Sequence, residues 1–166
     1  MALWETVERL AAHHDIESFA CGEASVDDWL HNSARGNSHF VATFVCLDAG
    51  GVVRGFFALR TIIVPVEGFS SRNRQGAVDG VSVGILLCQM GVSENDRGEG
   101  HGVLLLKRAM EEAANAHSSS PVLLFVIDAA NESLVSYYEK AGLTRVPNTL
   151  RLATRMSAVV KSLSLQ

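Results

Sequence analysis

The chain has 166 residues, of which 48% are hydrophobic and 19% are charged, and its formal net charge is −4. This length fits one domain with a substantial core, and the composition excludes an intrinsically disordered chain. No apolar stretch approaches the roughly 20 residues that cross a bilayer, and the amino terminus lacks the pattern of a secretory signal. We therefore expect a single domain over residues 1–166, located in the cytoplasm, with no general attraction to nucleic acids or membranes.

The cysteines and histidines show no metal-binding pattern. Cys21, Cys46 and Cys88 form neither a CxxC pair nor a cluster with zinc spacing, so we expect reduced thiols. Cys46 and Cys88 lie inside apolar runs, which favours small buried hydrophobic residues over a catalytic role. His13 and His14 are adjacent, and no histidine belongs to an i, i+4 metal motif. The sequence implies no metal.

The first elements in chain order are a short strand and a helix. We expect the strand at residues 19–22. Ser25 and Asp28 precede Trp29 and resemble a capping box, which predicts a helix that begins there and runs toward Ala34.

A hairpin follows. Residues 41–47 and 52–64 are rich in β-branched and aromatic residues and flank the turn at 48–51. The polar, glycine-containing stretch 67–80 is expected to be an exposed loop. Residues 81–92 are apolar almost throughout, which predicts a central strand covered on both faces.

The second half of the chain alternates helices and strands. After a turn at 93–96, apolar residues recur at helical spacing from Val103 to Ala113, and this helix ends at 118–121. A strand is expected at 122–127, a helix from Asn131 to Gly142, and a final strand at 150–156. The order predicts a mixed α/β domain.

The glycine-rich turn at 97–102 lies between a buried strand and a helix, where unpaired main-chain N–H groups and the positive helix end attract anions. Gly98, Gly100 and Gly102 would let a diphosphate approach the backbone and would permit positive φ angles, and Arg97 would add charge unless its side chain is engaged elsewhere. The Walker lysine is missing, and the spacing does not fit the dinucleotide fingerprint. Tight helix–strand packing is the alternative explanation for these glycines.

The run R-G-E-G-H-G at 97–102 resembles the Q/R-x-x-G-x-G/A acyl-coenzyme A motif of the GNAT acetyltransferase superfamily. Asn131 and the run Y-E-K-A-G-L at 138–143 resemble its later motif. The resemblance implies a mixed, mostly antiparallel central sheet of about six or seven strands flanked by helices. It also implies acetyl-CoA as cofactor, held by a splayed strand pair.

The resemblance further assigns cofactor contacts. The main chain of Met90, Gly91 and Val92 would pair with the pantetheine arm. Asn131 would also contact pantetheine, and its interpretation as a plain helix N-cap stays open beside this. The amides that would bind the diphosphate belong to Arg97, Gly98, Glu99, Gly100, His101, Gly102 and Val103.

Tyr138 is the expected general acid, because a phenol can protonate the thiolate that leaves when an amine attacks the thioester. The alternative is a core tyrosine, since it lies four residues after Leu134, whereas Tyr137 is expected to be structural. No general base is evident, because Cys88 and Gln89 occupy the strand where many relatives carry a carboxylate. An α-amine acceptor has a pKa of about 7.7 to 8.0 and is partly neutral at physiological pH, so it needs a general base less than a lysine side chain does.

A second resemblance covers the opening of the chain. Phe19, Cys21, Gly22, Val26, Asp27, Trp29 and Leu30 resemble the F-x-C-G-x-x-x-L-N/D-x-W-L opening of one GNAT branch, the toxins of toxin–antitoxin pairs. Members acetylate aminoacyl-tRNA, are neutralised by a ribbon-helix-helix antitoxin and often form homodimers. Such toxins are commonly basic, whereas this chain is acidic. The residues expected to contact tRNA phosphates are Arg72, Arg74, Arg145 and Arg151, with Arg155 nearby. The alternative is that these arginines are ordinary solvated surface charges.

Two other functions stay open. One is acetylation of a small amine or a protein amino terminus. The other is a non-catalytic acyl-CoA-binding module, which the cofactor would stabilise without any release of its thiol.

Overall fold

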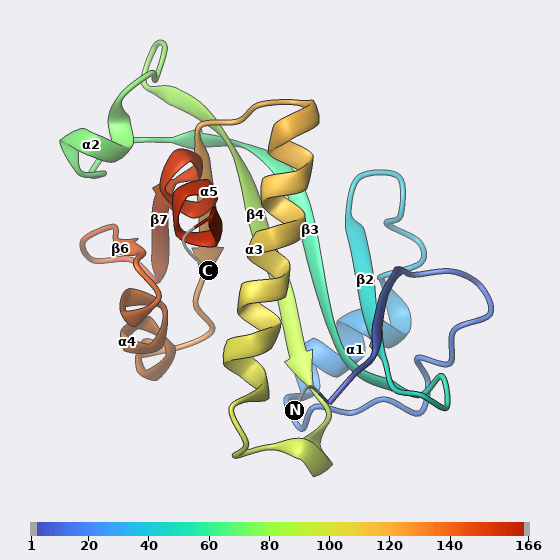
Figure 1. Ribbon diagram of the computed structural model, residues 1–166. Coiled ribbons are helices and arrows are strands. Elements are labelled where there is room, and N and C mark those ends of the chain that lie inside the picture. The colour runs from blue at the N-terminus through green and yellow to red at the C-terminus, as the bar shows by residue number, and fades with distance from the viewer. Residues whose placement is uncertain (1–2, 165–166) are drawn as a thin grey trace. The chain divides into compact units, whose positions relative to one another are not determined.

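The computed structural model describes residues 3–164 (Figure 1). The chain forms two compact units: unit 1 comprises residues 1–60 and 88–109, and unit 2 comprises residues 61–87 and 110–166. The elements are β1 (Thr6–Arg9), α1 (Ala24–Asn32), β2 (Ala42–Leu47), β3 (Val53–Pro65), α2 (Ser71–Arg74), β4 (Val81–Val92), the 3-10 turn η1 (Glu94–Asp96), α3 (His101–Ser119), β5 (Leu124–Asp128), α4 (Glu132–Lys140), β6 (Thr144–Arg145), β7 (Arg151–Arg155) and α5 (Met156–Ser164).

The strands of the described residues form one seven-stranded sheet in the order β1-β2-β3-β4-β5-β7-β6. The β4–β5 pair is parallel, whereas β1–β2, β2–β3, β5–β7 and β6–β7 are antiparallel. This confirms the expected mixed α/β class with a mostly antiparallel sheet. The single domain expected from the chain length stays a prediction.

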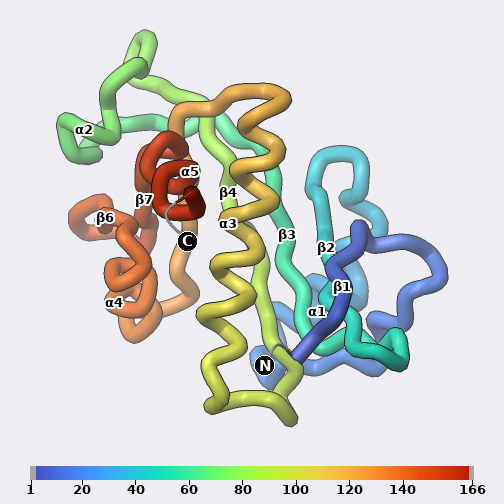
Figure 2. The backbone as a smooth tube through the Cα atoms, in the orientation of Figure 1, coloured from blue at the N-terminus to red at the C-terminus, as the bar shows by residue number. Residues whose placement is uncertain are grey.

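Unit 1 is a small sheet with α1 on one face (Figures 1 and 2). The hairpin between β2 and β3 is confirmed, and its turn is closed by Asp48, whose carboxylate accepts from the amides of Gly50 and Val52. Leu30 of α1 is fully buried with Val45 and Phe56 of the strands, because the apolar side of α1 packs on that face. This core supports the end of β4 and the loop that follows it.

In unit 2, pairing between β4 and β5 joins Gly84 to Leu124 and ends where Leu87 meets Ile127, whereas β4 runs on to Val92. The splayed strand pair that was expected to hold the cofactor stays a prediction. Helix α5 packs on β7 and β5. It was not expected from the sequence, although Met156 and Val159 are buried one helical turn apart.

The structure corrects two expectations near the start of the chain. Residues 19–22 form no strand, and Ser25 lies inside α1 rather than at its cap. Glu23 is the N-cap residue and makes no side-chain cap hydrogen bond, while the carboxylate of Asp27 turns back to the amides of Cys21 and Gly22. The helix ends at Asn32, earlier than expected.

Other corrections concern exposure and short elements. Val81 and Val83 are 40% and 43% exposed, so the start of β4 is not covered on both faces. The loop at 67–80 contains the short helix α2, which Ser70 caps through its hydroxyl. Strands β1 and β6 were also not predicted. No helix in the described part of the chain is long and apolar enough to cross a membrane.

Candidate active site

The glycine-rich loop of unit 1 has the backbone conformation that the sequence predicts. Gly98 and Gly100 have φ angles of 84° and 78°, and no heavy atom lies within 4 Å of a Cβ built at either position. Only glycine adopts this conformation without strain, and here its missing side chain leaves open space. Gly102 differs, because it lies in the first turn of α3 and is not among the residues with positive φ.

The loop carries free hydrogen-bond donors. Within residues 3–164, the structure shows no hydrogen bond of normal geometry from the main-chain N–H groups of residues 98–103. These groups lie at the amino terminus of α3, a helix of 19 residues, where the partial positive charge of the helix dipole is concentrated. The loop can therefore bind an anion through its backbone.

The Arg97 side chain is hydrogen-bonded within the protein. Its guanidinium donates to the carbonyl oxygen of Cys21, so the side chain is engaged with the protein's own backbone. The sequence left open whether this arginine adds charge to the phosphate site, and its contact in the structure answers that question.

Glu99 and His101 form a pair inside the loop. The imidazole Nε2 of His101 lies 3.1 Å from Oε2 of Glu99, and the Glu99 side chain is 72% exposed. His101 is 7% exposed, and its Nδ1 atom is buried without a partner in the described residues. The Glu99 side chain thus pairs with His101, whereas the cofactor role expected for both residues concerns their main-chain amides.

The end of β4 was expected to bind pantetheine through Met90, Gly91 and Val92. A Cβ at Gly91 would lie 3.0 Å from Cys21 Cβ and 3.3 Å from Phe56 Cε1. Glycine therefore relieves close packing inside unit 1, which is a cause that the sequence did not suggest. The pairing of this main chain with pantetheine stays a prediction.

In unit 2, Asn131 caps α4, and its Oδ1 accepts from the amide of Leu134 at 3.3 Å and from the Ser133 hydroxyl at 2.5 Å. This confirms the N-cap interpretation. The contact of Asn131 with pantetheine is a separate prediction. The helix stops before Gly142, whose φ is 101°.

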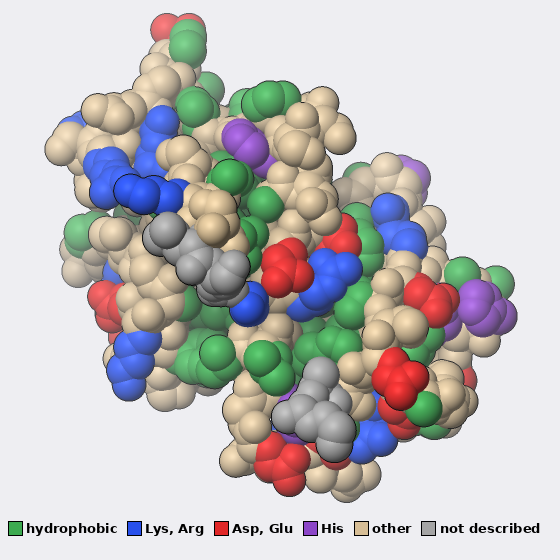
Figure 3. Space-filling model, viewed as in Figure 1, with side chains coloured by type: hydrophobic (Ala, Val, Ile, Leu, Met, Phe, Trp, Pro, Cys, Tyr) green, Lys and Arg blue, Asp and Glu red, His purple; other side chains and the backbone are tan. Residues whose placement is uncertain are grey.

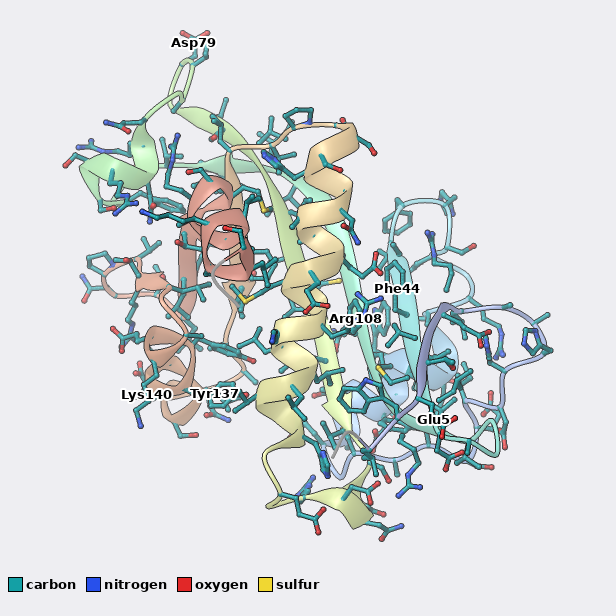
Figure 4. The ribbon with its side chains drawn as sticks, in the orientation of Figure 1. Glu5, Phe44, Asp79, Arg108, Tyr137 and Lys140 are labelled. Carbon is teal, nitrogen blue, oxygen red and sulfur yellow. The ribbon has the colours of Figure 1, made fainter. Side chains whose placement is uncertain are left out.

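Tyr138 lies on the buried face of α4 and is 7% exposed. Its ring packs edge-on against Tyr137, with the ring centroids 5.2 Å apart, and Figure 4 labels Tyr137 on this helix. Burial, followed by the neighbouring Tyr137, raises the pKa of Tyr138 above its ordinary value of 10.0. The phenol is therefore fully protonated at neutral pH, as a general acid must be.

Tyr137 has a feature that sequence reasoning missed. Its hydroxyl is buried and has no hydrogen-bond partner in the described residues, and burial raises its pKa. A buried hydroxyl without a partner destabilises the fold by about 1 to 3 kcal/mol. The sequence could not show which of the two adjacent tyrosines has the hydroxyl without a partner, because that depends on the direction of each side chain.

The three thiols are free, and burial raises the pKa of each one. The pKa of Cys21 is raised to about 11 and that of Cys46 to about 12. Cys88 is only partly buried, and its thiol donates to the carbonyl oxygen of Ala58 at 3.4 Å. No thiolate is therefore available near neutral pH to act as a base or nucleophile.

The four arginines expected to contact tRNA fall into two groups, all within unit 2. Arg145 donates to both carboxylate oxygens of Glu132, at 2.5 and 2.9 Å, and lowers the pKa of that carboxyl. Arg151 is paired in the same way with Asp128, at 2.7 and 2.9 Å. Each of these two guanidinium groups is therefore already paired with a carboxylate of the protein.

Arg72 and Arg74 form the second group and are exposed on α2. Arg155 of β7 holds the end of this helix, because its guanidinium donates to the carbonyl oxygens of Arg72 and Gln75. Figure 3 shows lysine and arginine side chains gathered over α2. The structure thus separates a basic surface at α2 from the paired arginines near β7.

Glu8, His13 and His14 bring three potential metal-ligand atoms within 4.8 Å of one another, which the sequence did not suggest. The amide of Ala11 donates to Nδ1 of His14, so the proton of the neutral ring lies on Nε2, 3.2 Å from Glu8. In this tautomer His14 offers no lone pair to an ion.

No protein-family model matches the sequence. A tRNA-acetylating toxin of Mycobacterium tuberculosis is 30% identical over 143 residues, which cover 83% of this chain and 83% of that protein. Among solved structures, AtaT complexed with acetyl-methionyl-tRNAfMet has a TM-score of 0.81 and 19% identity, covering 96% of this chain and 97% of that one.

A tyrosine-to-phenylalanine mutant of AtaT, bound to the carboxyl terminus of the antitoxin AtaR and to acetyl-CoA, has a TM-score of 0.77 and 18% identity. It covers 97% of this chain and 98% of that one. The fold is therefore that of the GNAT-type toxin acetyltransferases. Because of its similarity to the Mycobacterium tuberculosis protein, the chain belongs to the family of tRNA-acetylating toxins.

Proposed function

We propose that the protein transfers the acetyl group of acetyl-CoA to the α-amine of aminoacyl-tRNA. The observation that carries the proposal is the set of free main-chain N–H groups at residues 98–103, at the amino terminus of a long helix. Two glycines with positive φ leave this volume free of side chains, so the loop fits a diphosphate. The name of the curated relative and the acetyl-CoA bound by AtaT support the same cofactor.

Bound acetyl-CoA supplies the acetyl group as an activated thioester. The amides of residues 98–103 hold its diphosphate, and the main chain of residues 90–92 orients its pantetheine arm, with Asn131 as a further contact. Tyr138 holds a proton on its phenol oxygen and gives it to the departing sulfur, while the proton that the attacking nitrogen loses passes to solvent. Because its pKa is raised, Tyr138 carries this proton throughout the physiological pH range.

The acceptor is an α-amine for a chemical reason. The Cys88 thiol donates to Ala58 and has a raised pKa, so it is no base, and an α-amine near pKa 8 needs little help to lose its proton. AtaT was solved with acetyl-methionyl-tRNAfMet, the product of such a reaction. We place the enzyme in the cytoplasm, where charged tRNA occurs, and propose an antitoxin as its partner.

The direct test is to incubate the protein with labelled acetyl-CoA and bulk aminoacyl-tRNA. Label should enter tRNA that carries an amino acid and be absent from deacylated tRNA. Labelling of free amines or peptide amino termini instead would overturn the tRNA assignment and leave the acetyltransferase. Cofactor binding with no release of thiol to any amine would leave only a binding module.

Expression tests the toxin assignment in cells. Producing the protein alone should arrest growth, and producing Tyr138→Phe should not. Harmless expression of the active protein would favour a small-molecule or protein acceptor.

The two groups of arginines give a prediction about tRNA binding. Replacing Arg72 and Arg74 together by alanine should weaken tRNA binding and reduce the salt dependence of the affinity by about one unit of log–log slope per arginine. Arg151→Ala should change that slope much less, because its guanidinium is already paired with Asp128. Filter binding over a range of salt concentrations would measure both, and an unchanged slope in the double variant would remove α2 from the interface.

A further inference from the structure

The cofactor loop is held against a distant part of unit 1. The amide of Glu94 donates to the carbonyl oxygen of Ala20 at 2.9 Å, and Arg97 donates to the carbonyl oxygen of Cys21, 76 positions away in the sequence. Residues 20–22 therefore receive two hydrogen bonds from the segment that leads into Gly98.

Gly22 and Cys21 form the seat of Arg97, by which we mean the backbone against which its guanidinium packs. The φ of Gly22 is 91°, and a Cβ built there would lie 2.2 Å from Nη2 and 3.0 Å from Cζ of Arg97. These distances are far below van der Waals contact, so the guanidinium occupies the space where any other residue would have its side chain. A larger residue at position 22 would have to displace the guanidinium and would carry the strain of the positive φ, so glycine at this position lets Arg97 reach the carbonyl oxygen of Cys21.

The backbone of Cys21 and Gly22 is itself held in place by hydrogen bonds. The carboxylate of Asp27, in the first turn of α1, accepts from the amides of Cys21 at 2.8 Å and Gly22 at 3.3 Å. On the other side of the loop, Arg54 donates to both carboxylate oxygens of Asp96, and the amide of Ser93 donates to the carbonyl oxygen of Arg54. The segment 93–97 is held from two sides before the flexible glycines begin.

We propose that Arg97 is a positioning residue, which fixes the diphosphate-binding backbone by seating its guanidinium on Cys21 and Gly22 rather than by contacting the diphosphate. The inference rests on the proposed function of the loop. It also assigns a role to the Cys21–Gly22 pair, which supports cofactor affinity through its contact with Arg97.

The variant Gly22→Ala separates positioning from direct contact, because it keeps the charge of Arg97 but removes its seat. The readout is kcat/KM with acetyl-CoA and with acetyl-pantetheine, which carries the same thioester and no diphosphate. We expect Gly22→Ala to lower kcat/KM for acetyl-CoA about 10- to 100-fold, mainly through KM, and to leave kcat/KM for acetyl-pantetheine near its original value.

Gly51→Ala is the matched control, because Gly51 has a φ of 80° in the same unit and no atom within 4 Å of its Cβ position. It should leave both donors unaffected. In an Arg97→Ala background, Gly22→Ala should cause no further loss, since the seat then has no occupant.

Four results would overturn the inference, and the first three are an unchanged preference for acetyl-CoA in Gly22→Ala, an equal loss in Gly51→Ala, and additive effects of Gly22→Ala and Arg97→Ala. A loss of both donors in Gly22→Ala would show general damage and also count against it. Failure of the proposed function looks different, because the unsubstituted protein would then show no preference for acetyl-CoA over acetyl-pantetheine.

Discussion

Replacing Tyr138 by phenylalanine should lower kcat by about 10²- to 10⁴-fold while leaving the Kd of acetyl-CoA nearly unchanged. The substitution removes only the phenol oxygen from a side chain that is 7% exposed, so the packing of α4 is retained. The sulfur would then leave as an unprotonated thiolate, which raises the barrier of the chemical step alone. Single-turnover kinetics and calorimetry measure the two quantities separately.

Tyr137→Phe is the control for this experiment, because it removes the same atom from the adjacent residue of the same helix. The Tyr137 hydroxyl has no partner in the described residues, so its removal should leave turnover unchanged and raise Tm slightly. If Tyr137→Phe were the inactive variant and Tyr138→Phe the active one, the assignment of the acid would be reversed.

The pH profile provides a second check on Tyr138. The general acid must be protonated, and burial raises its pKa above 10.0, so its contribution is lost only as the pH rises through that higher value. The α-amine must be neutral, so kcat/KM should increase up to about pH 8 and then stay level. A decrease between pH 8 and 9 would indicate a different acid.

Gly100→Val should weaken acetyl-CoA binding by about 100-fold or more. Valine at a φ of 78° is strained, and its side chain would occupy the open space beside the free amides. The expected result is a loss of affinity beyond what the backbone strain alone causes, together with a modest decrease in Tm from that strain, and calorimetry with acetyl-CoA measures the affinity.

Gly51→Val is the matched control for that experiment, with a φ of 80° and equally open surroundings in a hairpin turn. It carries the same backbone strain without any role in binding. Equal affinities of the two variants would mean that strain, and not the loop at 97–103, explains the result.

How far the sequence predicted the fold depended on the strength of each local pattern. The residues of β4 are apolar almost throughout, and α3 repeats its apolar residues every three or four positions, so both were located closely. Strand β1 has only four residues with the burial pattern of an exposed edge, and such a strand has no apolar alternation to detect.

The candidate site also has parts that the sequence predicted and parts that it did not. The diphosphate loop is built from backbone, so its glycines are visible as letters, and Gly98 and Gly100 have the predicted conformation. The seating of Arg97 on Gly22 and the pairing of Arg145 with Glu132 join residues that are distant in the sequence or depend on side-chain direction. Such contacts are decided by tertiary packing, which no local pattern encodes.

The high pKa values of the three thiols protect the acetyl donor from a side reaction. A thioester exchanges its acyl group with a thiolate but not with a protonated thiol, and Cys21, Cys46 and Cys88 all remain protonated near neutral pH. The protein can therefore bind a reactive acyl donor without S-acetylation of its own cysteines, and the acetyl group is kept for the nitrogen acceptor.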